Sequence, residues 1–307
     1  MGVGVTLVLA LRILWFARRA HRVDAAHRFA REVDLALPPA VEPSVARLLG
    51  VRRQTGAVAG IVTSWLALLS WAGVAARWDL ADEPGASGIL VALVGVFVGE
   101  AIGHGLAAWR ESVRPAPAGP RVARASSPGL ADYVADREIW LARGAASIAA
   151  LITAAVAVLD RMVWTAPPGL PPAFLVTCGC VPALLVVVSE LAGARLAAKR
   201  QVAATTLELA WDDARRSRTL RDMVGVPMMA AVWVAFVLGA AAGNQVAATS
   251  PEAGSRLTNV THTVLILVLV AYGTIDMTRG SPHRHFRRRL WSTPVPGDTA
   301  IPAEVIP

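Results

Sequence analysis

The segment VGVPMMAAVWVAFVLGAAAGNQ, residues 224–245, contains no charged side chain. A helix needs about 20 mostly apolar residues to cross the hydrocarbon core of a bilayer. Six further stretches approach that length, and they lie at about 3–17, 57–77, 88–109, 144–164, 172–195 and 260–277. The sequence therefore predicts an all-α, polytopic helical membrane protein with about seven transmembrane helices.

The composition supports the same class. Apolar residues make up 55% of the 307 residues and charged residues 17%, with a mean hydropathy of +0.51, whereas soluble domains carry about 25% charged residues. Disorder, a disulfide scaffold and a soluble nucleic-acid binder are excluded on this basis. The two cysteines, Cys178 and Cys180, diverge by about 200° on a helix, so we expect no metal site and no cofactor.

The distribution of Lys and Arg predicts the orientation. Alternate connections hold 26 of the 30 basic residues, while the remaining connections hold only Arg77, Arg161 and Arg256. Because Lys and Arg gather on the cytoplasmic side, the N-terminus is expected outside and the C-terminus in the cytoplasm of a cell-membrane protein. Trp109 is expected at the inner boundary, and Trp78 and Trp164 at the outer one.

This orientation divides the chain into eight parts. We expect an N-out anchor helix (1–17), a cytoplasmic basic segment (18–56), hairpin 1 (57–109), a cytoplasmic linker (110–143), hairpin 2 (144–195), a cytoplasmic segment (196–223), hairpin 3 (224–278) and a basic cytoplasmic tail (279–307). The linker is expected to be disordered at 115–129, and the tail is expected to be disordered from about 293.

An internal repeat relates the first two hairpins. The segments VGEAIGHGLAAWR (98–110) and VSELAGARLAAKR (188–200) are identical at seven of thirteen positions, at an offset of 90 residues. Arg53 and Arg143 share this offset. The hairpins are therefore expected to be parallel repeats, which occur in transporters and also arise from duplication with a merely structural outcome.

Ionisable residues inside the spans are the candidate polar site. Glu100 and Glu190 occupy equivalent positions of the repeat, and His104 follows Glu100 at i,i+4. Charges within the membrane are costly and usually face protein or water. The glutamates can serve a proton or cation relay or a substrate anchor, or they can form structural ion pairs. Arg12 either pairs with one of them or extends to the inner headgroups.

Small residues recur every four positions beside these glutamates. They are Gly95, Gly99 and Gly103 in one span and Ser189 and Gly193 in another. Such faces let helices approach closely, so these residues are predicted to serve helix packing.

Common catalytic motifs are absent, since no HExxH, GxSxG or P-loop pattern occurs. Asp212 and Asp213 form an acidic pair that the following arginines can neutralise as solvated helical pairs. The Arg and Ala bias and the segment DDARRSRTLR give the chain a resemblance to uncharacterised multi-pass membrane proteins of high-GC actinobacteria. This resemblance implies a bacterial origin, and it does not indicate any particular activity.

Two functions fit these observations. The first is a non-catalytic membrane protein that binds a cytoplasmic protein partner through its inner segments, with the basic cluster HRHFRRRLW (283–291) available for anionic lipid. The alternative is a small-solute or proton-coupled transporter that uses Glu100, His104 and Glu190. Neither involves nucleic acid.

Overall fold

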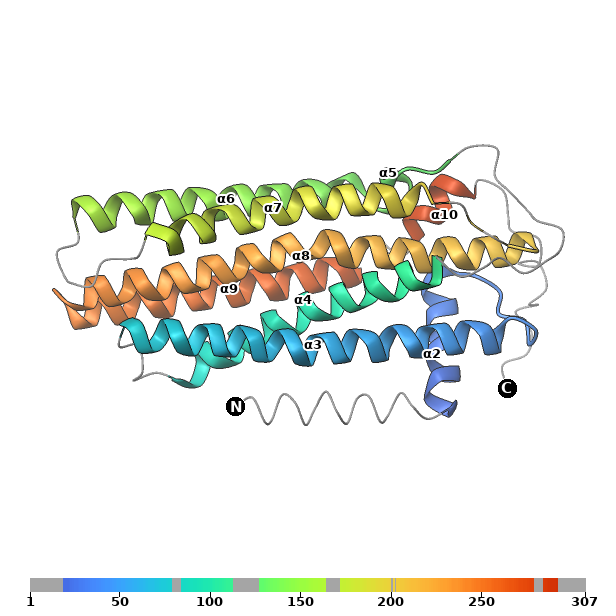
Figure 1. The fold of residues 1–307 in the computed structure, drawn as a ribbon, viewed down its shortest axis with the longest axis horizontal. Helices are drawn as coiled ribbons and strands as arrows, with labels where there is room; N and C mark the ends of the chain where they lie inside the picture. Colours follow the sequence, from blue (N-terminus) through green and yellow to red (C-terminus); the bar gives the residue numbers. More distant parts are fainter. Residues whose placement is uncertain are drawn as a thin grey trace.

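The computed structural model describes residues 19–78, 84–112, 127–163, 172–199, 201, 203–278 and 284–291, and within these ranges it is all-helical. The helices are α2 (Arg19–Val33), α3 (Glu42–Trp78), α4 (Pro84–Ser112), α5 (Leu130–Tyr133), α6 (Asp136–Met162), α7 (Pro172–Ala197), α8 (Thr206–Ala247), α9 (Pro251–Thr278) and α10 (His285–Leu290). Figure 1 shows the six long helices running broadly along one axis, while α2 crosses the bundle near one end.

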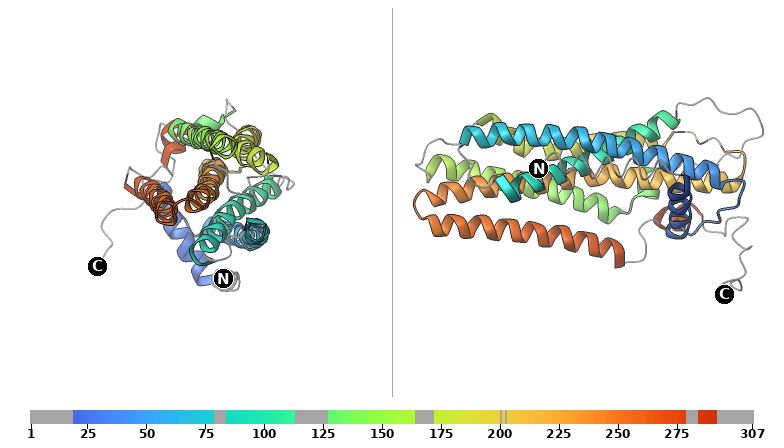
Figure 2. Two further views of the ribbon diagram at one scale, coloured as in Figure 1. Left: turned by 90° about the vertical axis from the view of Figure 1, so that its left-hand side faces the viewer. Right: turned by 90° about the horizontal axis from the view of Figure 1, so that it is seen from below.

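Helix α8 lies at the centre of the bundle. Helices that are consecutive in the chain pack against each other as the pairs α3–α4, α6–α7 and α8–α9, and α8 also contacts α4, α6 and α7. The end-on view in Figure 2 places α8 between the α6–α7 pair and the α3–α4 pair. Polar residues on α8 can therefore reach both pairs.

Local sequence defines the ends of α8. Thr205 is the N-cap residue, because its side chain accepts a hydrogen bond from the Glu208 backbone N–H. At the other end the chain turns at 248–250 and re-enters a helix at Ser250-Pro251, where proline suits the first helical position. At 42 residues, α8 is about 63 Å long, roughly twice the thickness of a bilayer's hydrocarbon core.

Four helical segments are long and apolar enough to cross a membrane: Glu42–Gly73, Asp136–Met162, Phe174–Ala197 and Thr206–Ala247. They support a helical membrane protein. The first predicted span, 3–17, lies outside the described residues. α4 and α9 occupy two further predicted spans and are helical, but they are not among these four.

Large apolar side chains that are exposed lie on the peripheral helices. Their positions include Leu66 on α3, Phe97 on α4, Leu151 on α6, Leu184 on α7 and Leu267 on α9. No large apolar side chain of α8, all of whose residues are described, is exposed in this way. An extended apolar surface of this kind is typical of contact with lipid rather than water.

One end of the bundle carries a compact, partly polar region. We call it the cap, and it consists of α2, α5, α10, residues 42–56 of α3 and residues 206–223 of α8. Its buried core includes Phe29, Tyr133, Trp211, Leu220 and Phe286. Where the structure describes them, the segments expected to be cytoplasmic connections are largely helical, since α3 begins at Glu42 and α8 at Thr206.

Candidate functional site

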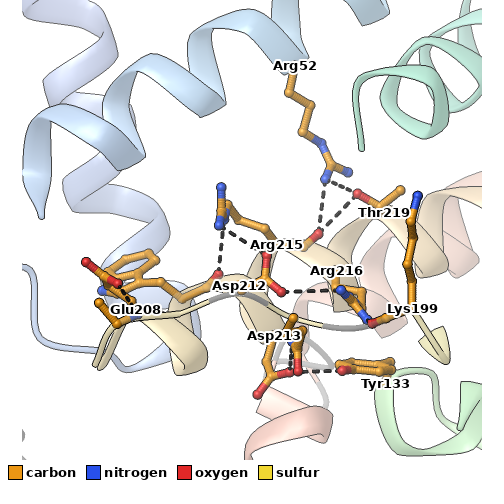
Figure 3. A network of polar contacts seen from close by, with 12 residues as sticks. Arg52, Tyr133, Lys199, Glu208, Asp212, Asp213, Arg215, Arg216 and Thr219 are labelled. Carbon is orange, nitrogen blue, oxygen red and sulfur yellow. Dashed lines mark hydrogen bonds and ion pairs between the residues drawn. The ribbon is translucent and has the colours of Figure 1, made fainter. Parts of the chain in front are cut away.

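The cap half of α8 is the hub of a polar network that reaches most of the other helices. Its side chains contact α3, α4, α5, α6, the end of α7 and the residue after α10, as Figure 3 shows in part. Because α8 continues from the cap into the bundle, this network connects the cap to every helix pair.

Asp222 joins three helices at the base of the cap. Its Oδ2 atom accepts hydrogen bonds from Arg52 Nη2 of α3 and from His104 Nδ1 of α4, each at 2.6 Å. The Arg52 side chain is only 10% exposed, and it also donates to the Thr219 hydroxyl. A buried guanidinium needs such a counter-charge, because an unpaired buried cation is strongly destabilising.

His104 occupies a notch between α3 and α8. A Cβ atom added at Gly56 of α3 would come within 2.6 Å of His104 Nε2. Only glycine leaves room for the imidazole at this position. The contact explains how His104 can approach α3 on one side and the Asp222 carboxylate of α8 on the other.

Asp213 is the second centre of the network, and the expectation that it forms a solvated helical pair is wrong. Asp213 is fully buried. Its carboxylate accepts hydrogen bonds from the Tyr133 hydroxyl at 2.9 Å, from Gln201 at 2.6 Å and from the Trp291 indole at 2.9 Å. Three donors from different segments replace water around this charge, as burial of a carboxylate requires.

Asp212, by contrast, pairs within its own helix as expected. It lies within 3.2 Å of Arg215 and 3.4 Å of Arg216. Arg216 also donates to the backbone oxygens of Ala197 and Lys199, which ties the end of α7 to α8. The Ala197 carbonyl belongs to the last turn of α7, where orphan acceptors need donors.

A buried ion pair connects α6 to α8. Arg221 Nε donates to Glu138 Oε2 at 2.8 Å, and both side chains are about one-tenth exposed. Glu138 Oε1 has no hydrogen-bond partner. The adjacent cavity has a volume of about 10 Å³, room for no more than one water molecule.

Glu190, one of the predicted site residues, pairs with an arginine of the neighbouring helix. Arg143 of α6 donates to both of its carboxylate oxygens, through Nε at 2.7 Å and Nη2 at 2.8 Å. The expected partner, Arg12, lies outside the described residues. The Arg143–Glu190 pair joins α6 to α7, and its surroundings include the exposed side chains of Trp140 and Leu191.

Glu100 and His104 lie on the α3-facing side of α4. A Cβ atom added at Gly60 of α3 would lie 3.5 Å from Glu100 Cγ. Glu190 belongs to the α6–α7 pair, on the other side of α8 (Figure 2). The structure therefore brings Glu100 and His104 to one helix interface and places Glu190 at another.

The glycines of α4 lie directly against the backbone of α3. A Cβ atom added at Gly95 would come within 2.6 Å of Ser64 Cα, and one added at Gly103 within 2.7 Å of Gly56 Cα. Gly99 is equally close to α3, since its Cβ atom would meet the backbone of Ala59 at 2.7 Å. This interface permits the hydrogen bond from the Thr63 hydroxyl to the Gly95 carbonyl oxygen.

The two predicted packing residues of α7 have other neighbours. Ser189 is buried and donates to the Val186 carbonyl of its own helix at 2.9 Å. Gly193 faces the cap and α8, because its Cβ atom would lie 3.2 Å from Leu130 and 3.4 Å from Leu220. Gly103 and Gly193, which are equivalent in the repeat, thus pack against different elements.

The described part of the basic tail is packed into the cap. Phe286 is fully buried in the cap core, and the Trp291 indole donates to Asp213. Arg287 pairs with Asp34 at 3.0 Å. Arg288 and Arg289 are exposed, so only part of this cluster is presented to the surroundings.

The sequence analysis missed Asp222 and Arg52. Arg52 entered only as one of the basic residues of the inner connections, and Asp222 was not singled out. A usable signal existed, because each lies within five residues of the start of a predicted apolar span, at 224 and 57. Charges at that depth have fewer water molecules to solvate them and are more often paired.

The network holds helices together, because its buried charges contact groups on other helices and segments. Among the described residues no three His, Cys, Asp or Glu side chains gather as metal ligands. Cys178 is buried and Cys180 is exposed, on different faces of α7.

The chain matches no protein-family model, no curated protein and no solved structure.

Proposed function

We propose that the protein is a non-catalytic, multi-pass membrane protein whose cytoplasmic cap binds a protein partner. The observation that carries this proposal is the cap itself. Segments that only had to connect spans are instead folded around a buried core and fastened to α8 by buried polar contacts. A surface of fixed shape on one side of the membrane is what a partner requires.

The proposal includes the finer topology. Seven spans follow from the apolar stretches, and an outer N-terminus and a cytoplasmic C-terminus follow from the distribution of basic residues. In this arrangement the cap lies in the cytoplasm. The ratio of 29 Arg to one Lys also supports an origin in a high-GC bacterium.

We further propose that the hairpins are parallel repeats that arose by duplication. The offset of 90 residues maps the Arg143–Glu190 pair onto Arg53 and Glu100. Glu100 lies on the face of α4 that contacts α3 near Gly60, which is seven residues, or about two turns, beyond Arg53. Arg53 and Glu100 thus belong to the paired helices α3 and α4, as Arg143 and Glu190 belong to α6 and α7.

Partner binding can be tested by photo-crosslinking in intact cells. The crosslinking amino acid is placed at the exposed cap positions Arg28 and Arg31, and for comparison at the exposed positions Ser255 and Asn259 of α9. We expect discrete crosslinked species from the cap positions alone. The same species from both sets, or none from the cap, would contradict partner binding.

The alternative is a proton-coupled transporter, which one observation favours. His104, Asp222 and Arg52 form a cluster of titratable and charged groups at the inner end of the bundle. Flux assays in liposomes test it, with Glu100→Gln, His104→Gln and Glu190→Gln compared with wild type. Loss of a proton or solute flux in all three variants would favour transport over partner binding.

A further inference from the structure

We infer that the ends of α4 and α7 form a binding site for the headgroup of an anionic phospholipid. The inference rests on the membrane placement proposed above and not on partner binding by the cap. The site consists of Trp109 and Arg110 in the last turn of α4, Arg195 in the last turn of α7, and Lys199 just beyond it.

Lys199 and Trp109 bring the two helix ends together. The Lys199 ammonium lies 4.6 Å from the centroid of the Trp109 ring, at the distance of a cation–π contact. Trp109 is about half exposed. A tryptophan with an apolar body and a polar edge is the side chain typically found at the level of lipid headgroups.

The backbone of Lys199 is held in position by Arg216 of α8. Arg216 of α8 donates to the carbonyl oxygens of Ala197 and Lys199 and thereby satisfies acceptors at the end of α7. Figure 3 shows the Lys199 side chain extending away from Arg216. Arg195 and Lys199 place two further positive charges at this helix end, where cations are favourable.

The charge of the two helix ends suits a phosphate. Arg110 and Arg195 are exposed, and they lie in the last turns of α4 and α7, beside Trp109 and Lys199 in sequence. With Glu111 counted, residues 109–112 and 195–199 together carry a net charge of +2. Guanidinium and ammonium groups donate strong, charge-assisted hydrogen bonds to phosphate oxygens.

Apolar side chains continue from this cationic site along both helices. Ile102 and Leu106 of α4 and Val188 and Leu191 of α7 are each about half exposed. Phe174–Ala197 is one of the segments long enough to cross a membrane, so Lys199 lies about 3 Å past its end. An amphiphile with acyl chains and an anionic phosphodiester matches both parts of this surface, whereas free phosphate matches only one.

The test measures lipid retention by the purified full-length chain. Native mass spectrometry counts bound phosphatidylglycerol and phosphatidylcholine after incubation with equal amounts of each. The double variant Arg195→Gln/Lys199→Gln is compared with Arg47→Gln/Arg137→Gln, which removes two exposed arginines, one in the cap and one in the first turn of α6. At about 1 kcal/mol for each basic residue near anionic lipid, the first variant should bind phosphatidylglycerol roughly 30-fold more weakly.

The control variant should keep the wild-type preference for phosphatidylglycerol, and Lys199→Arg should keep most of it. Excess inorganic phosphate should not displace the lipid. Melting in lipid-free detergent shows whether each variant is folded. Equal binding of the two lipids by wild type, equal losses in the two double variants, or displacement by free phosphate would overturn the inference.

Discussion

One carboxylate oxygen of Asp222 serves α3, α4 and α8 at once. Arg52 depends on this single counter-charge, because its other hydrogen bonds go to neutral acceptors. These are the Thr219 hydroxyl and the backbone carbonyl oxygen of Arg215. Single substitutions can therefore distinguish the buried contact of Asp222 from an ordinary charge pair within one helix.

Asp222→Asn should lower the free energy of unfolding by about 3 kcal/mol, because it leaves the Arg52 cation buried without a counter-charge. Unfolding in mixed micelles by titration with denaturing detergent measures the change. Asp212→Asn removes only pairs within one helix and should cost less than about 1 kcal/mol. Equal losses in the two variants would mean that Asp222 does not hold Arg52 in place.

Arg143 and Glu190 should be coupled in a double-mutant cycle. Arg143→Gln and Glu190→Gln should each lower the melting temperature, since each breaks the same bidentate pair. The double variant should melt no lower than the weaker single variant, because the pair can be lost only once. Strictly additive losses would show that the two charges act independently.

The sequence predicted that Glu190 and His104 would need partners, but it did not identify them. The free-energy cost of placing an ionisable side chain in the membrane shows that the residue needs a partner, but it does not show which residue is the partner. Arg143 lies 47 residues from Glu190, and Asp222 lies 118 residues from His104. Both partners belong to helices whose positions depend on tertiary packing, so periodicity within one helix could not reveal them.

At the scale of elements, α3 and α4 are held by close approach of their backbones. The glycines of α4 and the small residues Gly56, Gly60 and Ser64 of α3 form a shared contact face. In a membrane, dispersion contacts of this kind drive association because lipid tails solvate large apolar side chains equally well. The packing should therefore respond to the addition of a single methyl group.

Gly99→Ala should destabilise the protein by about 1–3 kcal/mol, because its Cβ atom would meet the backbone of Ala59 on α3. Gly144→Ala is the matched change on α6, where the Cβ atom meets nothing within 4 Å. This second variant should be more stable by about 0.5–1 kcal/mol, the gain in helix propensity. Shifts of the same sign in both would argue against backbone contact at Gly99.

The helices were predicted correctly in the apolar stretches of the chain, but their extensions into polar stretches were not predicted. Each described stretch predicted to span the membrane forms part of a helix. The extensions into the cap were missed, because residues 206–223 of α8 carry Asp and Arg side chains that resemble a solvated connection. Burial of Trp211, Asp213 and Leu220 is supplied by α2, α5 and α10, and no local pattern indicates that those elements assemble there.

At the scale of the whole molecule, two kinds of surface meet along one axis. Exposed apolar side chains cover the peripheral helices, and the cap carries exposed charges such as Arg28, Arg31 and Arg47. α8 passes through both regions and is about twice as long as a bilayer core is thick. We propose that the apolar part spans the membrane while the cap stays on the cytoplasmic side.

Substituted-cysteine labelling tests this claim most directly. After replacement of Cys178 and Cys180, single cysteines are placed at Ser44, near the cap end of α3, and at Ser255, near the opposite end of the bundle; both positions are exposed. A membrane-impermeant maleimide is then applied to intact cells and to inverted vesicles. We expect labelling of Ser255→Cys in cells only and of Ser44→Cys in inverted vesicles only. Labelling of both from the same side would contradict it.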